Sequence, residues 1–157
     1  MKILKKLLIS ILIVLAIAQF FGPEKNDGDL ATVASFLVET NPPQDVKKIL
    51  ETTCFDCHSA KSTYPWYNAI TPVNYWLDEH IQDGKKHLNF SKWNTYSLKK
   101  KEHKMDELHE EVEEGEMPLN SYTWTHSEAN LTPAQIVAVV TWGKKVHADY
   151  KQQITAK

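Results

Sequence analysis

The feature that most constrains this chain is a five-residue segment that contains both of its cysteines. The segment reads Cys54-Phe55-Asp56-Cys57-His58, a C-x-x-C-H pattern, and no other cysteine occurs in the 157 residues. Two thiols three positions apart lie close together on one turn, and an imidazole follows directly after the second. The chain must therefore fold around a site that combines two sulfurs with one imidazole, without any further cysteine to form a disulfide.

This spacing is the one at which a chain attaches haem covalently. On a tightening turn each thiol can bond to a vinyl-derived carbon of one porphyrin, while the imidazole lies under the iron. The alternatives are a redox-active or simple disulfide and half of a zinc site. A thioredoxin-like pair should follow a strand in an α/β pattern, and a zinc site needs further well-spaced ligands; the sequence offers neither. We therefore expect one haem c, bound through Cys54 and Cys57, with His58 as an axial ligand of the iron.

The sequence identifies the second axial ligand less clearly than the first. Met117 follows Gly115 and precedes Pro118 in a predicted loop. A loop methionine stiffened by proline can present its sulfur to iron, so Met117 is our candidate. Met105 lies on the apolar stripe of a predicted helix, where methionine usually fills the core. His87, which precedes Leu-Asn-Phe, is the main rival and would give bis-histidine ligation.

The other histidines and the aromatic residues are expected to have mainly structural roles. Three histidines lie among charged residues of predicted helices, where a solvated position is usual, and His147 lies near lysines in the last helix. These three are His80, His103 and His109. Aromatic residues are concentrated near the motif, where they can wall a haem pocket or form the core. They are Tyr64, Trp66, Tyr67, Tyr75, Trp76, Phe90, Trp93, Tyr122 and Trp124.

Apolar periodicity predicts helices, and no segment shows the alternation of a strand. The predicted helices are a short one that runs into Cys54, one from Thr71 that Gly84 ends or interrupts, one that Gly115 ends, and one from Thr132. The last has the clearest start, with proline at the first helical position and a capping-box glutamine. We therefore predict an all-α domain.

The N-terminus reads as an export segment. Three lysines precede the uninterrupted apolar run LLISILIVLAIAQFF, a pattern typical of signal peptides. At about 1.5 Å per residue this run covers roughly 22 Å, less than an apolar bilayer core of about 30 Å. A cleaved signal peptide and a short inner-membrane anchor helix both remain open, and in either case we expect an exported, periplasmic protein. We assign residues 1–22 to this segment, 23–30 to a solvated linker and 31–157 to the haem-binding domain.

The charge of the predicted domain indicates which classes of partner it can bind. Beyond the apolar run, fifteen lysines oppose twenty acidic residues, and the chain has no arginine. No basic surface for nucleic acid is expected. The acidic run that leads to Met117 would suit a basic redox partner protein, although such runs are usually solvated helix faces. Residues 3–21 offer the chain a means of membrane association.

Four stretches resemble the bacterial haem-binding-domain family of small monohaem c-type cytochromes. They are CFDCHS at 54–59, YPWYNAITPVNYWL at 64–77, HLNFSKW at 87–93 and EEVEEGEMP at 110–118. The resemblance covers most of the chain from about residue 45 to 145. It implies a cytochrome c-like helical domain with His58 and Met117 as axial ligands, and it leaves the redox partner open.

These features favour a single-electron carrier over an enzyme. With both axial positions filled, haem iron has no place for a substrate, and no other catalytic constellation is visible. The alternative is a haem-based sensor or peroxidase-like enzyme, in which Met117 is not bound and His87 or His126 assists at an open distal site. A thiol–disulfide exchange module is the third possibility.

Overall fold

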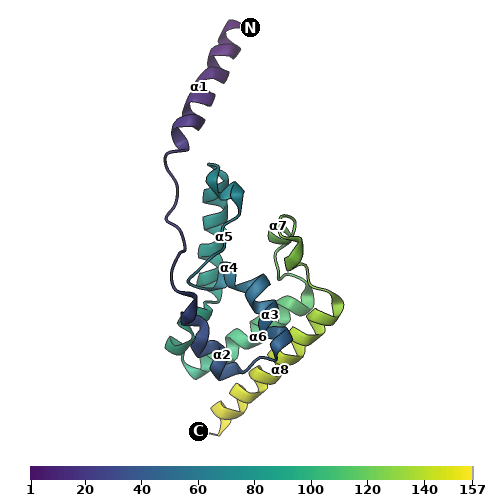
Figure 1. The fold of residues 1–157 in the computed structure, drawn as a ribbon. Helices are drawn as coiled ribbons and strands as arrows, with labels where there is room; N and C mark the ends of the chain where they lie inside the picture. Colours follow the sequence, from purple (N-terminus) through teal and green to yellow (C-terminus); the bar gives the residue numbers. More distant parts are fainter. Residues whose placement is uncertain (157) are drawn as a thin grey trace.

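The computed structural model describes residues 1–156, which form an all-α protein (Figure 1). The predicted fold class is confirmed at this level, because no strand occurs in the described part and only an isolated bridge joins Asp27 to Lys61. The predicted domain ends at Lys157, which lies outside the described residues. The elements are α1 Lys2–Ala18, η1 Leu30–Val33, α2 Ala34–Thr40, α3 Gln44–Ile49, η2 Leu50–Cys54, α4 Phe55–His58, η3 Trp66–Ala69, α5 Val73–His87, η4 Phe90–Thr95, α6 Leu98–Glu114, α7 Asn120–Thr123, η5 Ser127–Ala129 and α8 Pro133–Thr155.

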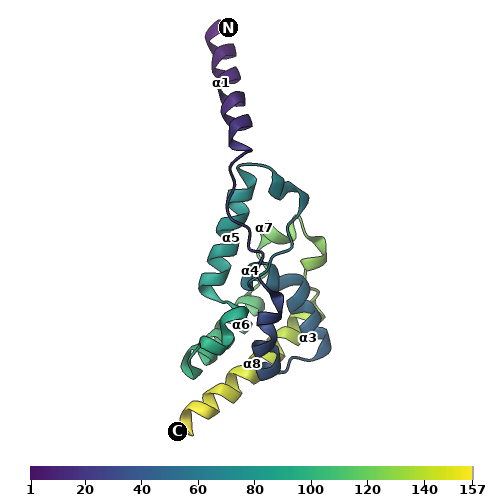
Figure 2. The same ribbon diagram turned by 60° about the vertical axis from the view of Figure 1, so that its left-hand side comes forward.

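The N-terminal apolar segment forms the single helix α1. None of its residues is buried, and it extends away from the other helices in both views (Figures 1 and 2). Within residues 1–156, no helix combines the length and the apolar character needed to cross a membrane. The helix takes no part in the core, whose first member along the chain is Val33.

Part of the segment between α1 and η1 is packed against the chain that follows the motif. Asn26 is buried, and its side-chain amide donates to the carbonyl of Ser59 at 3.1 Å and to Oγ of Ser62 at 2.8 Å. The backbone N–H of Gly28 donates to the carbonyl of Ala60 at 2.8 Å. The prediction of a solvated linker over 23–30 is therefore wrong for Asn26, whose buried side chain is fixed by these hydrogen bonds.

The helix before the motif and the last helix lie where the sequence predicts them. Val46, Ile49 and Leu50 are buried along α3 and the start of η2. At the start of α8, the side chain of Thr132 accepts from the backbone of Gln135, whose side chain accepts from the backbone of Thr132. This reciprocal capping box satisfies N–H groups that the first turn leaves unpaired.

Gly84 neither ends nor interrupts α5, contrary to the prediction for it. The helix runs on to His87, and the backbone N–H of Leu88 still donates to the carbonyl of Gly84. Leu77 and Ile81 are buried on one face of α5, whereas Trp76 is 43% exposed. A glycine is present at position 84 because α5 packs closely against the motif there.

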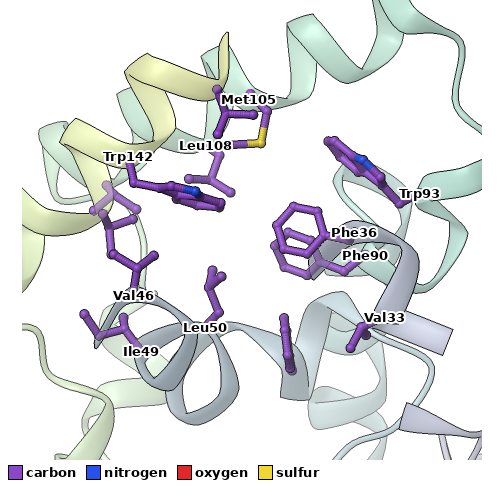
Figure 3. Close-up of a cluster of buried hydrophobic side chains, with 14 of the residues drawn as sticks. Val33, Phe36, Val46, Ile49, Leu50, Phe90, Trp93, Met105, Leu108 and Trp142 are labelled. Carbon is purple, nitrogen blue, oxygen red and sulfur yellow. The ribbon is translucent and has the colours of Figure 1, made fainter. Parts of the chain in front are cut away.

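The core is formed mainly by α2, α3, η4, α6 and α8, with single residues from η1, η2 and α4 (Figure 3). The ring of Phe36 lies 4.4 Å from that of Phe90 and meets Trp93 edge-on at 5.0 Å, and all three side chains are almost fully buried. Met105 is also fully buried, as its position on the apolar stripe of α6 predicts. Trp142 of α8 donates to the backbone carbonyl of Thr40 at 3.2 Å, which ties α8 to the end of α2.

Candidate functional site

The C-x-x-C-H segment lies where a π-helical turn passes into a short helix. Cys54 is the last residue of η2, and Cys57 and His58 belong to α4. Phe55, between the two cysteines, is 3% exposed, and its ring packs against Phe90 with the centroids 5.4 Å apart. This aromatic contact anchors the motif to the core and gives the two thiols and the imidazole a fixed position.

The two cysteines form no disulfide with each other. Burial raises the pKa of Cys54 to about 12 and that of Cys57 to about 11. Thiols that take part in disulfide exchange have lowered pKa values, because the thiolate is the nucleophile. This environment therefore argues against the thiol–disulfide exchange hypothesis and is compatible with thiols that end in a covalent bond.

The imidazole of His58 is oriented by the backbone that follows α5. Its Nδ1 lies 2.9 Å from the carbonyl oxygen of Leu88. Because a carbonyl only accepts, Nδ1 carries the proton and donates, and Nε2 keeps its lone pair. Burial lowers the pKa of His58, which favours the neutral ring. A neutral imidazole whose other nitrogen is held by a carbonyl is the form in which histidine binds a metal.

Gly84 allows α5 to approach the motif. A Cβ at this position would lie 2.8 Å from the carbonyl oxygen of Cys57 and 3.1 Å from its Cβ. Contacts this short between a carbon and a backbone oxygen are repulsive, so a side chain would push the two helices apart. One turn further on, Leu88, the residue that directly follows α5, supplies the carbonyl that holds His58. α5 therefore positions both the second cysteine and the histidine.

A closed ring of contacts connects the motif with the loop that follows α6. Tyr122 of α7 donates to Oδ2 of Asp56, inside the motif, at 3.0 Å, and burial together with this carboxylate raises the pKa of Tyr122. The hydroxyls of Tyr67 and Thr125 are 2.9 Å apart and join η3 to the chain after α7. In turn, η3 packs on α5 and α5 on α4. Both α5 and α7 rise above the level of α4 in the two ribbon views (Figures 1 and 2).

The elements of this ring carry unusually exposed tryptophans. Trp66 of η3 is 80% exposed, Trp124 beside α7 is 89% exposed and Trp76 of α5 is 43% exposed. Exposed aromatic rings on the elements around the motif offer apolar surface that a ligand or a partner can cover. A flat, largely apolar macrocycle would cover such rings, and the cysteines and His58 offer the donors that haem attachment needs. The residues present around the motif therefore fit haem.

Met117 lies in the loop that leaves α6. Gly115 has a φ of 77° and ends the helix, and the backbone N–H of Met117 then donates to the carbonyl of Glu111 at 3.0 Å. The side chain is partly buried at the edge of the core. Five residues later, Tyr122 holds the same loop on Asp56 of the motif. The loop is thus tethered to the motif, and iron ligation by Met117 stays a prediction.

The histidines differ in how far their positions match the sequence-based expectation, and His103 is exposed as predicted. His87, the rival axial ligand, is exposed at the end of α5. His109 is buried, so the expectation of a solvated residue is wrong; α6 packs this face against α8, where Gly143 leaves room for its side chain. His126 is partly buried and stacks on Tyr122 with the ring centroids 4.2 Å apart.

Sequence reasoning missed several residues that hold the motif in place. Asn26 bonds to the chain after the motif and also accepts from Nζ of Lys85 on α5, at 2.7 Å. Tyr122 was considered only as an aromatic wall, although its hydroxyl pairs with Asp56. A carboxylate inside the apolar motif was the available signal, because such a group needs a donor when the motif is buried.

A separate hollow on the protein surface lies away from the motif. Its volume is about 720 Å³, and it lies between the end of α2, α3 and α8. No cysteine, histidine or methionine lines it. It therefore lacks the side chains that bind haem iron, and the candidate site is the ring around the motif.

Comparison with known proteins agrees with this site. A family model described as a haem-binding domain matches residues 13–145. No curated protein and no solved structure matches the chain. The matched range contains the motif, every element of the ring and the loop that carries Met117. The family resemblance predicted from the sequence is confirmed: the chain belongs to the haem-binding domain family.

Proposed function

We propose that this haem-binding protein is an exported c-type cytochrome that transfers single electrons. In this proposal Cys54 and Cys57 form thioether bonds to one haem c, and His58 is an axial ligand. When bound, haem supplies reversible one-electron exchange between ferric and ferrous iron. The observation that carries the proposal is the hydrogen bond from Nδ1 of His58 to Leu88, which leaves Nε2 free for iron beside two unpaired thiols.

Met117 is our proposed second axial ligand. Its loop is held against the motif by the contact between Tyr122 and Asp56. A thioether ligand raises the reduction potential, and a filled sixth position excludes small substrates. Electron transfer then requires only a partner that approaches the haem closely.

The helix that precedes Met117 supports a basic redox partner. Exposed carboxylates follow one another toward the loop: Glu110, Glu111, Glu113, Glu114 and Glu116. Complementary charge steers an encounter and speeds association, an effect that salt screens. We expect electron exchange with a basic partner to slow as ionic strength rises, and a rate that does not depend on salt would contradict this part of the proposal.

Export is proposed from the N-terminal segment, either by cleavage or by retention at the inner membrane. The lysines in the first turns of α1 and the apolar sequence that follows them in that helix have the order of a signal peptide. Mass spectrometry of the protein recovered from periplasmic and membrane fractions separates the two forms. The full-length mass in the cytoplasmic fraction alone would refute export.

An optical spectrum tests the cofactor and its ligands together. We expect haem to stay with the chain through acid–acetone extraction, and the oxidised protein to show a weak near-infrared sulfur-to-iron band. Met117→Ala should abolish that band, while the matched control Met105→Leu, in the core, should keep it. Haem that extracts would refute covalent attachment.

The same experiment decides the second candidate function, a haem-based sensor or peroxidase-like enzyme. The observation that favours it is His126, which is partly buried, stacks on Tyr122 and lies near Tyr67 within the ring. If the spectrum of Met117→Ala matches that of the wild type, the sixth position is open or filled by another residue. Binding of cyanide or nitric oxide to the wild-type protein would then support the sensor or enzyme.

A further inference from the structure

A second cluster of ligating side chains lies between α6 and α8, on different elements from the C-x-x-C-H motif. It consists of Asp106 and His109, three positions apart on α6, and His147 on α8. One donor atom from each residue lies within 4.8 Å of the other two. We propose that these three side chains bind one divalent transition-metal ion of the zinc class, which links α6 to α8.

Glu102 fixes the orientation of the His147 ring and the nitrogen that carries its proton. Nε2 of His147 lies 2.9 Å from Oε1 of Glu102, so the proton of the neutral ring is on Nε2 and the lone pair is on Nδ1. Nδ1 lies 3.0 Å from Oδ1 of Asp106. Two acceptors this close repel each other unless a proton or a cation lies between them. Histidines that bind metals commonly donate their other N–H to a carboxylate, as His147 does here.

His109 approaches the same carboxylate oxygen from the buried side. Its Nε2 lies 3.2 Å from Oδ1 of Asp106, and the residue is only 7% exposed. Its Nδ1 is buried without a hydrogen-bond partner. Gly143 makes this placement possible, because a Cβ there would lie 2.9 Å from the Cβ of His109. The imidazole of His109 thus lies inside the interface between α6 and α8, and its polar contact there is with Asp106 of the cluster.

The distances suit a small tetrahedral ion. Metal–ligand bonds of about 2.0 to 2.1 Å place neighbouring ligand atoms about 3.3 Å apart. The two contacts to Oδ1 of Asp106, at 3.0 and 3.2 Å, are close to this value. The side chain of Asp106 is 39% exposed, so an ion can enter from solvent and keep water in its fourth position.

The donor set selects the class of ion. Two imidazole nitrogens and one carboxylate suit zinc, copper, nickel or cobalt, whereas calcium and magnesium prefer oxygen ligands. The competing occupant is a second proton on His147, which would form an imidazolium between Asp106 and Glu102. Metal content distinguishes the two, because only the metal site retains an ion after dialysis.

The test is equilibrium dialysis of the full-length protein, without a histidine tag, against zinc at neutral pH, with zinc measured by mass spectrometry. We expect one zinc per chain. His147→Gln and Asp106→Asn should lose it, and Glu102→Gln should weaken binding by about 10- to 100-fold. The control is His103→Gln, an exposed residue of α6 that pairs with Glu107 and should leave zinc binding unchanged.

Circular dichroism of each variant establishes that it is folded before its zinc content is compared. If His147→Gln does not fold, Asp106→Asn and Glu102→Gln carry the test, because both retain the side-chain shape. A wild-type protein that retains no zinc would overturn the proposal, as would equal binding by wild type and the folded variants. Asp106, His109 and His147 are not the haem ligands, so failure of this test would leave the proposed electron transfer untouched.

Discussion

Substitution of Gly84 by alanine tests whether α5 must touch the motif as closely as described. Inside an ordinary helix, glycine to alanine stabilises a protein by roughly 0.5 to 1 kcal/mol, because alanine loses less backbone entropy on folding. At Gly84 the new methyl group would lie 2.8 Å from the backbone oxygen of Cys57 and 3.1 Å from its Cβ. Overpacking of this kind typically costs about 1 to 3 kcal/mol, so the sign of the effect should reverse.

We therefore expect a net loss of about 1 kcal/mol in the free energy of unfolding. For a domain of this size that corresponds to a fall in Tm of about 3 to 5 °C. Urea unfolding followed by far-ultraviolet circular dichroism measures the loss directly. Because the displaced atoms belong to Cys57, we also expect a lower yield of covalent haem in the exported variant.

The control is Gln82→Ala, an exposed position two residues earlier in α5. A surface substitution of this kind should change stability by no more than about 0.5 kcal/mol and should leave haem attachment unchanged. If Gly84→Ala is more stable than the wild type, the ordinary helix effect prevails. The close approach between α5 and Cys57 would then be wrong.

Three further perturbations test other parts of the site and core. Tyr122→Phe removes the bond to the carboxylate of Asp56 and should cost about 1 to 2 kcal/mol, measured by urea unfolding; an unchanged stability would show that the ring is not closed there. Phe36→Ala empties the centre of the core and should cost about 3 to 5 kcal/mol by the same assay, whereas a loss below about 1 kcal/mol would contradict the packing. The haem-free protein should lose stability between the ordinary thiol pKa of 9.0 and about pH 11, by about 1.4 kcal/mol per pH unit and per thiol, because in this range Cys54 and Cys57 ionise in the unfolded chain and stay protonated in the folded one. Protein with both thioethers should lack this alkaline loss, and equal pH profiles for the two forms would argue against attachment at these sulfurs.

The helices were predictable where one face is apolar and the ends carry their own signals. The start of α8 at Thr132 and the end of α6 at Gly115 are of this kind, because the cap residues act within one turn of the chain. Gly84 was misread for the opposite reason. A glycine in a helix has the same local appearance whether it ends the helix or admits a neighbour, and only the position of Cys57 distinguishes the two.

The motif could be recognised from the sequence because its cysteines and histidine lie within five consecutive residues. The residues that hold the motif in place come from distant positions in the chain. Asn26, which precedes the motif in the sequence, donates from its side-chain amide to the carbonyl of Ser59, just after the motif. Leu88, which follows the motif, accepts from His58 through its backbone carbonyl. Every asparagine has such an amide and every residue has such a carbonyl. No local pattern marks such groups, so they emerge only when the chain is folded.

The cluster between α6 and α8 is a case in which the sequence does carry a signal for a site built from distant residues. Asp106 and His109 have the i, i+3 spacing that places two side chains on one face of a helix, and that spacing is visible in the sequence. His147 comes from a different helix, and its partnership with them depends on Gly143, which lets the helices meet at His109. A glycine four residues before a histidine in one helix, opposite an acid–histidine pair in another, is a combined signal: the glycine allows close approach and the histidine completes the set. If zinc binds there, the same combination can be sought wherever two amphipathic helices pack side by side.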